Sequence, residues 1–134
     1  MLRFELTITG DQEVINRLRT AGRVAPQAVD DTTYRWAQSV RAKLKSTPYP
    51  AKRPGQRYVR KGLFANSWRA ERLGGGRVRI ANSAPYSGWV VGGGPHNRQA
   101  RVHAGRWWIG ANVVRENLPD LGRNIVKELD RLLK

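Results

Sequence analysis

The chain opens with alternating apolar and polar residues, a pattern that predicts a half-buried β-strand. The apolar positions are Leu2, Phe4, Leu6 and Ile8. Asp11 then offers a helix N-cap, and we expect a short helix from there to about Arg19, ended by Gly22. That helix would bury Val14, Ile15 and Leu18.

Apolar residues next recur at spacings of three and four, which predicts a longer amphipathic helix with Pro26 in its first turn. The apolar stripe comprises Val29, Thr33, Trp36, Ala37, Val40 and Leu44. We expect Trp36 to anchor the core rather than to bind a ligand. Pro48 breaks this helix.

The same spacing returns at the C-terminus and predicts a second amphipathic helix, with Asn117 as its cap and Pro119 in its first turn. Its apolar residues are Leu118, Leu121, Ile125, Leu129 and Leu132.

The centre of the chain reads as β-structure. Residues 68–73 and 77–82 flank three consecutive glycines and predict a hairpin with a flexible loop. Residues 86–91 form a third candidate strand, and residues 107–109 are either a last strand or a packing plug.

Together these elements predict one α+β domain over residues 1–134. A small antiparallel sheet would pack against the long helix and the C-terminal amphipathic helix. Two long basic loops, residues 47–62 and 92–106, lie on either side of a central block that contains the hairpin and the third candidate strand. We expect both loops to be mobile arms.

Charge sharpens this picture because it is both large and segregated. The chain carries a formal net charge of +15, and residues 32–115 hold seventeen basic side chains against one acidic one, Glu71. Solubility alone does not require such segregation, so we favour an acidic partner, either nucleic acid or an acidic protein surface.

Several functional classes receive no support. The absence of cysteine excludes disulfides and thiolate metal sites. The chain has no apolar run of about 18 residues and no signal-peptide pattern at its start, so we expect it to begin in a cytoplasm. The glycine clusters lack the Lys-Ser or Lys-Thr of a phosphate loop, and neither Ser67 nor Ser83 lies in a nucleophile elbow. We predict no cofactor, no metal and no enzymatic activity.

His96 and His103 suit a metal site poorly, since they are seven residues apart with no nearby carboxylate. With an arginine and Glu71 they could serve a metal-free ribonuclease, but loop histidines are more often surface residues. Basic residues also interleave with tyrosines and tryptophans. Proteins that bind nucleic acid by contacting its phosphate backbone and stacking on its bases have this composition. No sequence-specific DNA-binding motif is present, so only nonspecific binding remains as an alternative.

The order of the central motifs resembles the tailed-phage head–tail joining (neck or minor tail) family. That family shows Thr-Gly-x-Leu-x-x-Ser, a two-strand stretch, and Tyr-Ala-x-Tyr-Val-Glu-x-Gly. Here Lys61-Gly62-Leu63-Phe64-Ala65-Asn66-Ser67-Trp68 precedes the hairpin, and Pro85-Tyr86-Ser87-Gly88-Trp89-Val90-Val91-Gly92 follows it. Lys61 replaces the family's Thr, and Val91 replaces its Glu. The residues that carry the resemblance are Gly62, Leu63, Ser67, Tyr86 and Trp89.

The resemblance implies a non-enzymatic virion protein of a tailed phage or prophage, assembled in the bacterial cytoplasm. It would form a homo-oligomeric ring between the portal or connector and the tail tube, or complete the tail. We expect the motif residues to turn and pack the chain, and the loops to contact partner proteins or DNA phosphates. The predicted contact residues are Lys52, Arg53, Arg57, Tyr58, Arg60, Lys61, Arg98, Arg101 and Arg106.

Overall fold

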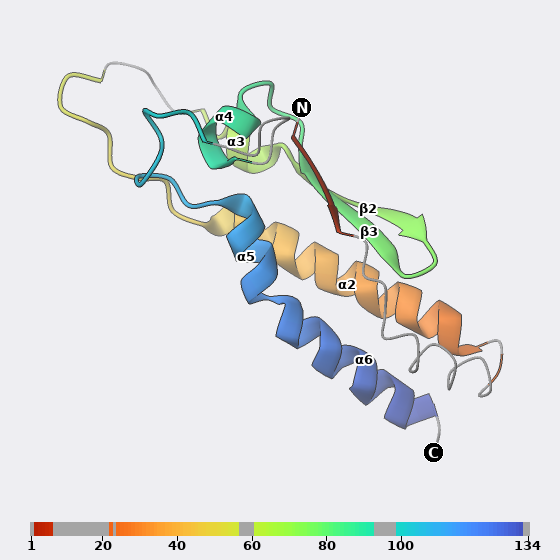
Figure 1. Ribbon diagram of the computed structural model, residues 1–134. Helices are drawn as coiled ribbons and strands as arrows, with labels where there is room; N and C mark the ends of the chain where they lie inside the picture. Colours follow the sequence, from red (N-terminus) through yellow and green to blue (C-terminus); the bar gives the residue numbers. More distant parts are fainter. Residues whose placement is uncertain (1, 7–21, 23, 57–60, 93–98, 133–134) are drawn as a thin grey trace.

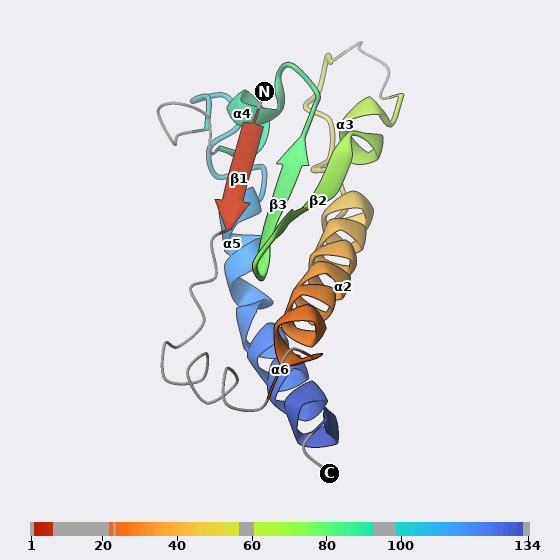
Figure 2. The ribbon, with the colours of Figure 1, turned by 90° about the vertical axis from the view of Figure 1, so that its right-hand side faces the viewer.

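The computed structural model describes residues 2–6, 22, 24–56, 61–92 and 99–132, with residues 2–6 described at the level of the backbone. It has the predicted α+β class (Figures 1 and 2). The strands are β1 (Leu2–Leu6), β2 (Trp68–Gly74) and β3 (Arg77–Asn82), which form an antiparallel sheet in the order β1-β3-β2. The helices are α2 (Val24–Ser46), α3 (Leu63–Asn66), α4 (Ser87–Val91), α5 (Gly110–Glu116) and α6 (Leu118–Leu132).

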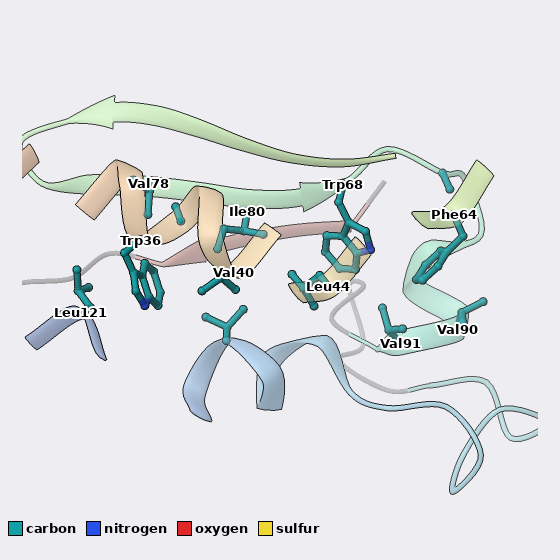
Figure 3. Close-up of a cluster of buried hydrophobic side chains, with 13 residues drawn as sticks. Trp36, Val40, Leu44, Phe64, Trp68, Val78, Ile80, Val90, Val91 and Leu121 are labelled. Atoms are coloured by element: carbon teal, nitrogen blue, oxygen red, sulfur yellow. The ribbon is translucent and has the colours of Figure 1, made fainter. Parts of the chain in front are cut away.

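Helix α2 is the element against which the sheet and α6 both pack (Figure 1). The predicted stripe is confirmed: every member from Thr33 to Leu44 is buried, and Val29 is half-buried. Val78 and Ile80 point from alternate positions of β3 toward this stripe and are completely buried (Figure 3). On the α6 side, Leu121 joins the same core. The C-terminal helix is therefore confirmed as well.

Trp36 is the core anchor that the sequence predicts, with 3% of its surface exposed. Its indole N–H donates to the carbonyl oxygen of Asn117 over 2.8 Å, which fixes α2 to the junction of α5 and α6. Asn117 lies directly before α6, but its side chain bonds elsewhere. Its amide donates to the Val113 carbonyl at 2.7 Å, and its Oδ1 accepts from Lys43.

The hairpin turn is tight and is held by α2, where the sequence suggested a flexible loop. Gly75 and Gly76 have φ of +65° and +75°, a conformation that favours glycine. The Gly76 N–H donates to the buried Asp30 carboxylate at 3.0 Å. Arg72 of β2 bridges Asp30 and Asp31 at 2.9 and 2.5 Å, and its hydrogen bond lowers the pKa of Asp31.

The third strand expected in the second half of the chain is wrong. Residues 86–91 are not a strand: Ser87–Val91 form α4. Tyr86, Trp89 and Val90 have the spacing of a helical turn, and the left-handed φ of Gly92, +76°, stops the helix after one turn. Of the two alternatives for residues 107–109, the packing plug is confirmed: Trp107 and Trp108 pack against the core, and these residues form no strand.

The predicted helix between residues 11 and 19 lies outside the described residues, and the short helices α3 and α5 were not predicted. None of the described helices has the length and apolar character needed to cross a membrane.

Candidate functional site

The motif residues and the described parts of both basic loops gather at one end of the molecule. Helices α3 and α4, residues 47–56 and residues 99–109 all lie at the end opposite the C-terminal end of α6 (Figures 1 and 2). The two loops flank the central block in sequence, but in space they are neighbours.

The first motif forms a turn followed by the single turn of α3. Gly62 has φ of +74°, and a Cβ there would lie 3.3 Å from the Asn66 amide nitrogen. Ser67 is buried, and its hydroxyl donates to the Leu63 carbonyl at 2.6 Å. These two residues shape the backbone. Leu63, between them, is 56% exposed and does not pack into the core.

Asn82, at the end of β3, joins the segments on which the second motif stands. Its side chain is completely buried. The Nδ2 group donates to the Phe64 carbonyl at 2.8 Å, and Oδ1 accepts from the Ala84 N–H at 2.9 Å. The buried Ser87 hydroxyl donates to the Asn82 carbonyl at 3.2 Å. One residue thus holds α3, the connecting turn and α4 together.

The second motif presents aromatic surface instead of packing it away. Tyr86 is 42% exposed, with its ring stacked on Phe64 at 6.3 Å, and Trp89 is 65% exposed. Val90 and Val91 hold α4 down by inserting into the core, where Figure 3 shows the Phe64 ring projecting from α3 toward α4. The expectation that Trp89 packs the chain is therefore wrong.

Gln99 fastens the second loop to α4, a role that sequence reasoning missed. Its side-chain amide lies 2.9 Å from the carbonyl oxygens of Val90 and Trp107 and 3.2 Å from that of Trp108. The Ala100 N–H adds a hydrogen bond of 2.8 Å to the Trp89 carbonyl. Nothing in the local sequence around Gln99 indicates these contacts, because all of them depend on tertiary placement.

Two arginines bind the loops to each other. Arg53 donates to the Val102 carbonyl at 3.2 Å, and Arg106 donates to the Ala51 carbonyl at 2.9 Å. The loops also contact each other through two rings, since the Tyr49 and Trp107 rings have a centroid distance of 5.3 Å. Arg53 and Arg106 therefore have structural bonds as well as charge.

The described members of the predicted contact set lie around this end. Lys52, Lys61 and Arg101 are exposed, Arg53 is exposed beside its bond, and Arg106 is half-buried. The remaining predicted contacts lie outside the described residues: Arg57, Tyr58, Arg60 and Arg98.

Between α3, α4 and the two loops lies a concavity of about 500 Å³, which we call the aromatic hollow. Rings and aliphatic side chains form most of its wall, and Lys61 contributes a positive charge to it. The lining residues are Tyr49, Lys61, Gly62, Leu63, Phe64, Tyr86, Trp89, Val90, His103 and Trp107. The three exposed motif residues, Leu63, Tyr86 and Trp89, thus border one shared space.

Burial perturbs two titratable groups of the hollow. It lowers the pKa of His103, and the nearby charges of Arg106 and Arg53 lower it further. Burial also raises the pKa of the Tyr86 hydroxyl, with Tyr49 as the lesser cause. Both groups are neutral near pH 7.

The titratable groups that line the hollow are His103, Tyr49, Tyr86 and Lys61. None of the residues that line the hollow beside His103 carries a carboxylate. Glu71 is paired with Arg79 across the hairpin at 3.2 Å. His96, its proposed ribonuclease partner, lies outside the described residues. Among the residues the structure describes, no group of three His, Cys, Asp or Glu could hold a metal ion.

In comparisons with protein-family models, curated proteins and solved structures, nothing matches this chain.

The buried amide of Asn82 gives a first prediction. In Asn82→Ala, the Phe64 carbonyl and the Ala84 N–H lose their partners, and we expect unfolding to become easier by roughly 2–4 kcal/mol. Urea denaturation followed by tryptophan fluorescence measures this. Asn124→Ala, on the exposed face of α6, is the matched control and should change stability little. Equal effects of the two variants would contradict the assigned role.

His103 gives a second prediction. Its folded pKa lies below the ordinary value of 6.5, so the unfolded chain binds this proton more tightly. Its contribution to stability is therefore complete above about pH 6.5 and is lost as pH falls below that value. Thermal unfolding at about pH 7.5 and 5.5 should show a larger acid-induced drop in Tm for the wild type than for His103→Gln. The same drop in both proteins would show that His103 is not involved.

Proposed function

We propose that this protein is a structural virion component of a tailed phage or prophage, a head–tail joining, neck or tail-completion protein. It works as a ring-forming subunit between the portal or connector and the tail tube. It needs no cofactor and catalyses no reaction.

The observation that carries this proposal is that Leu63, Tyr86 and Trp89 are exposed around one hollow. These are residues through which the chain resembles the neck family. Exposed apolar surface gathered at one site is typical of protein interfaces, and tryptophan and tyrosine are enriched at their energetic centres. An interaction protein explains this exposure better than an enzyme does.

The position of the loops supports the same proposal. Residues 47–56 and 99–106 lie at the same end of the molecule as α3 and α4, and Tyr49 and His103 line the hollow together with the exposed motif residues. That end can approach a neighbouring subunit or ring while α2 and α6 extend away from it (Figure 2). Aromatic residues beside arginines provide the usual composition of an interface core.

Mass measurement tests the proposal directly. The purified protein is combined with connector or tail-tube protein, and the complexes are sized by light scattering or native mass spectrometry. We expect a ring-sized complex, and we expect particles made without this protein to lack joined tails. Trp89→Ala should weaken the complex, while Val126→Ala, an apolar residue 58% exposed on α6, should not. A chain that joins neither partner and is dispensable for complete virions would refute the proposal.

A second candidate function is nonspecific binding to nucleic acid. The observation that favours it is the meeting of the two basic loops, which brings Lys52, Lys61 and Arg101 to the same end as the exposed Trp89. Phosphate contact with ring stacking is the usual mode of sequence-independent binding to single strands. Both functions can coexist if the ring encloses the path of the DNA.

Salt dependence tests this second function. Each phosphate contact adds about one unit to the slope of log affinity against log salt concentration. We therefore expect Arg101→Ala to reduce the slope by about one unit, and Lys127→Ala, exposed on α6, to leave it unchanged. A slope near zero in the wild-type protein would exclude phosphate binding.

A further inference from the structure

We propose that the aromatic hollow binds a segment of a partner protein in which an aromatic or long aliphatic side chain is flanked by carboxylates. This inference names the chemistry of the partner in the proposed function. It rests on that function, because the proposed function is what makes the partner a protein.

The size and lining of the hollow fit an apolar anchor. Its volume of about 500 Å³ is within the range of sites that bind small ligands, so a large side chain can enter it. Phe64 lies in its wall with Tyr86 and Trp107 at ring-centroid distances of 6.3 and 5.7 Å. A side chain entering there would contact ring faces and edges, and an aromatic anchor gains from such pairing beyond the area that it buries.

The walls are fixed before a partner arrives, which reduces the entropic cost of binding. The Tyr49 hydroxyl accepts from the Ala65 N–H of α3 at 2.9 Å. The Tyr49 ring also contacts the Trp107 ring, so this side chain is fixed by two contacts. Asn82 and Gln99 hold the backbones of α3, α4 and the second loop. Trp89 lines the same space and leaves 65% of its surface exposed for a bound side chain to cover.

The charge around the hollow selects carboxylates on either side of the anchor. Lys61 lies in its lining, and Arg53 and Arg106 lie close enough to His103 to lower its pKa. From residue 72 to residue 115 the sequence contains no acidic residue. A lysine-rich segment would therefore be repelled here, whereas an acidic one gains attraction and specificity.

A second copy of this chain is a poor source of those carboxylates, because most of its described acidic groups are already paired. Arg72 pairs with Asp30 and Asp31, and Arg79 pairs with Glu71. On α6, Asp120 pairs with Arg123 and Glu128 with Arg131. Recruiting them would break existing bonds, so the carboxylates of a different protein fit better.

A nucleobase fits the hollow less well than an apolar side chain does. Base edges carry donors and acceptors that must be satisfied when they leave water. The Tyr49 hydroxyl already bonds the backbone, and rings make up most of the wall. A phenylalanine or aliphatic anchor brings no such requirement, and a tryptophan brings only one indole N–H.

A panel of synthetic peptides tests the inference on the full chain. A central Trp, Phe, Leu or Ala is flanked either by Asp and Glu or by Lys, and binding is measured by fluorescence anisotropy beside a single-stranded oligo-dT. We expect the acid-flanked peptides with Trp, Phe or Leu to bind. Exchanging the anchor for Ala should weaken binding about tenfold or more, and lysine flanks should abolish it.

Variants locate the binding. Trp89→Ala and Lys61→Glu should each weaken the best peptide about tenfold, whereas the α6 controls Val126→Ala and Lys127→Glu should bind as the wild type does. Trp89 and Lys61 are exposed, so circular dichroism should show an intact fold.

Three results would overturn the inference: no acid-flanked peptide binds, the Ala anchor binds as well as Trp, or Trp89→Ala has no effect. Binding of oligo-dT that depends on Trp89, without peptide binding, would assign the hollow to nucleic acid instead. Failure of the proposed function is separable, because peptides would still bind a chain that joins no virion partner. Conversely, a ring that assembles normally without peptide binding would refute only the hollow's role.

Discussion

The aromatic hollow depends on one buried amide, that of Asn82. Val78 and Ile80 point toward α2 from alternate positions of β3, and Asn82 is the next residue on that same face. A polar side chain there must find partners inside the protein, since water cannot reach it. It finds them in α3 and in the turn before α4, and Ser87 adds a bond to its carbonyl. The alternation that builds the core thus also fixes where the segments that line the hollow lie.

The rest of the structure gives this amide a rigid base. β3 is the central strand, paired on both sides, so its last residue cannot shift without disturbing both ladders. Helix α2 covers the sheet and holds the far end of the hairpin through Asp30, whose carboxylate accepts from Gly76 and Arg72. The hairpin is therefore held at both ends, and its α3–α4 end carries the exposed motif residues. Rigid support of this kind lets single turns of helix present exposed rings in defined positions.

Sequence periodicity was enough to predict α2 and α6, because each has a long apolar face at helical spacing, and the alternation of β3 beside the glycine turn was enough to predict the hairpin. It failed for residues 86–91, where valines and aromatics suggested a strand although Tyr86, Trp89 and Val90 have helical spacing. A segment of one turn is too short for a period to show clearly. The site was harder still: Arg53 and Val102 are 49 residues apart, and no local pattern reveals that their loops meet. Composition drew attention to the basic loops, whose binding role stays a prediction, whereas the exposure of Leu63 and Trp89 required the structure.

The large positive charge and the exposed rings make physical sense together. An apolar surface such as that of Leu63, Tyr86 and Trp89 would promote self-association in a neutral protein. Here two copies that approach through this end bring like charges together, and repulsion opposes the contact. An acidic partner removes the repulsion and covers the rings in one step, so charge would govern the rate of encounter and the rings the lifetime of the complex. In the proposed ring, this end would turn toward the connector or tube, because the basic ends favour an acidic partner over one another.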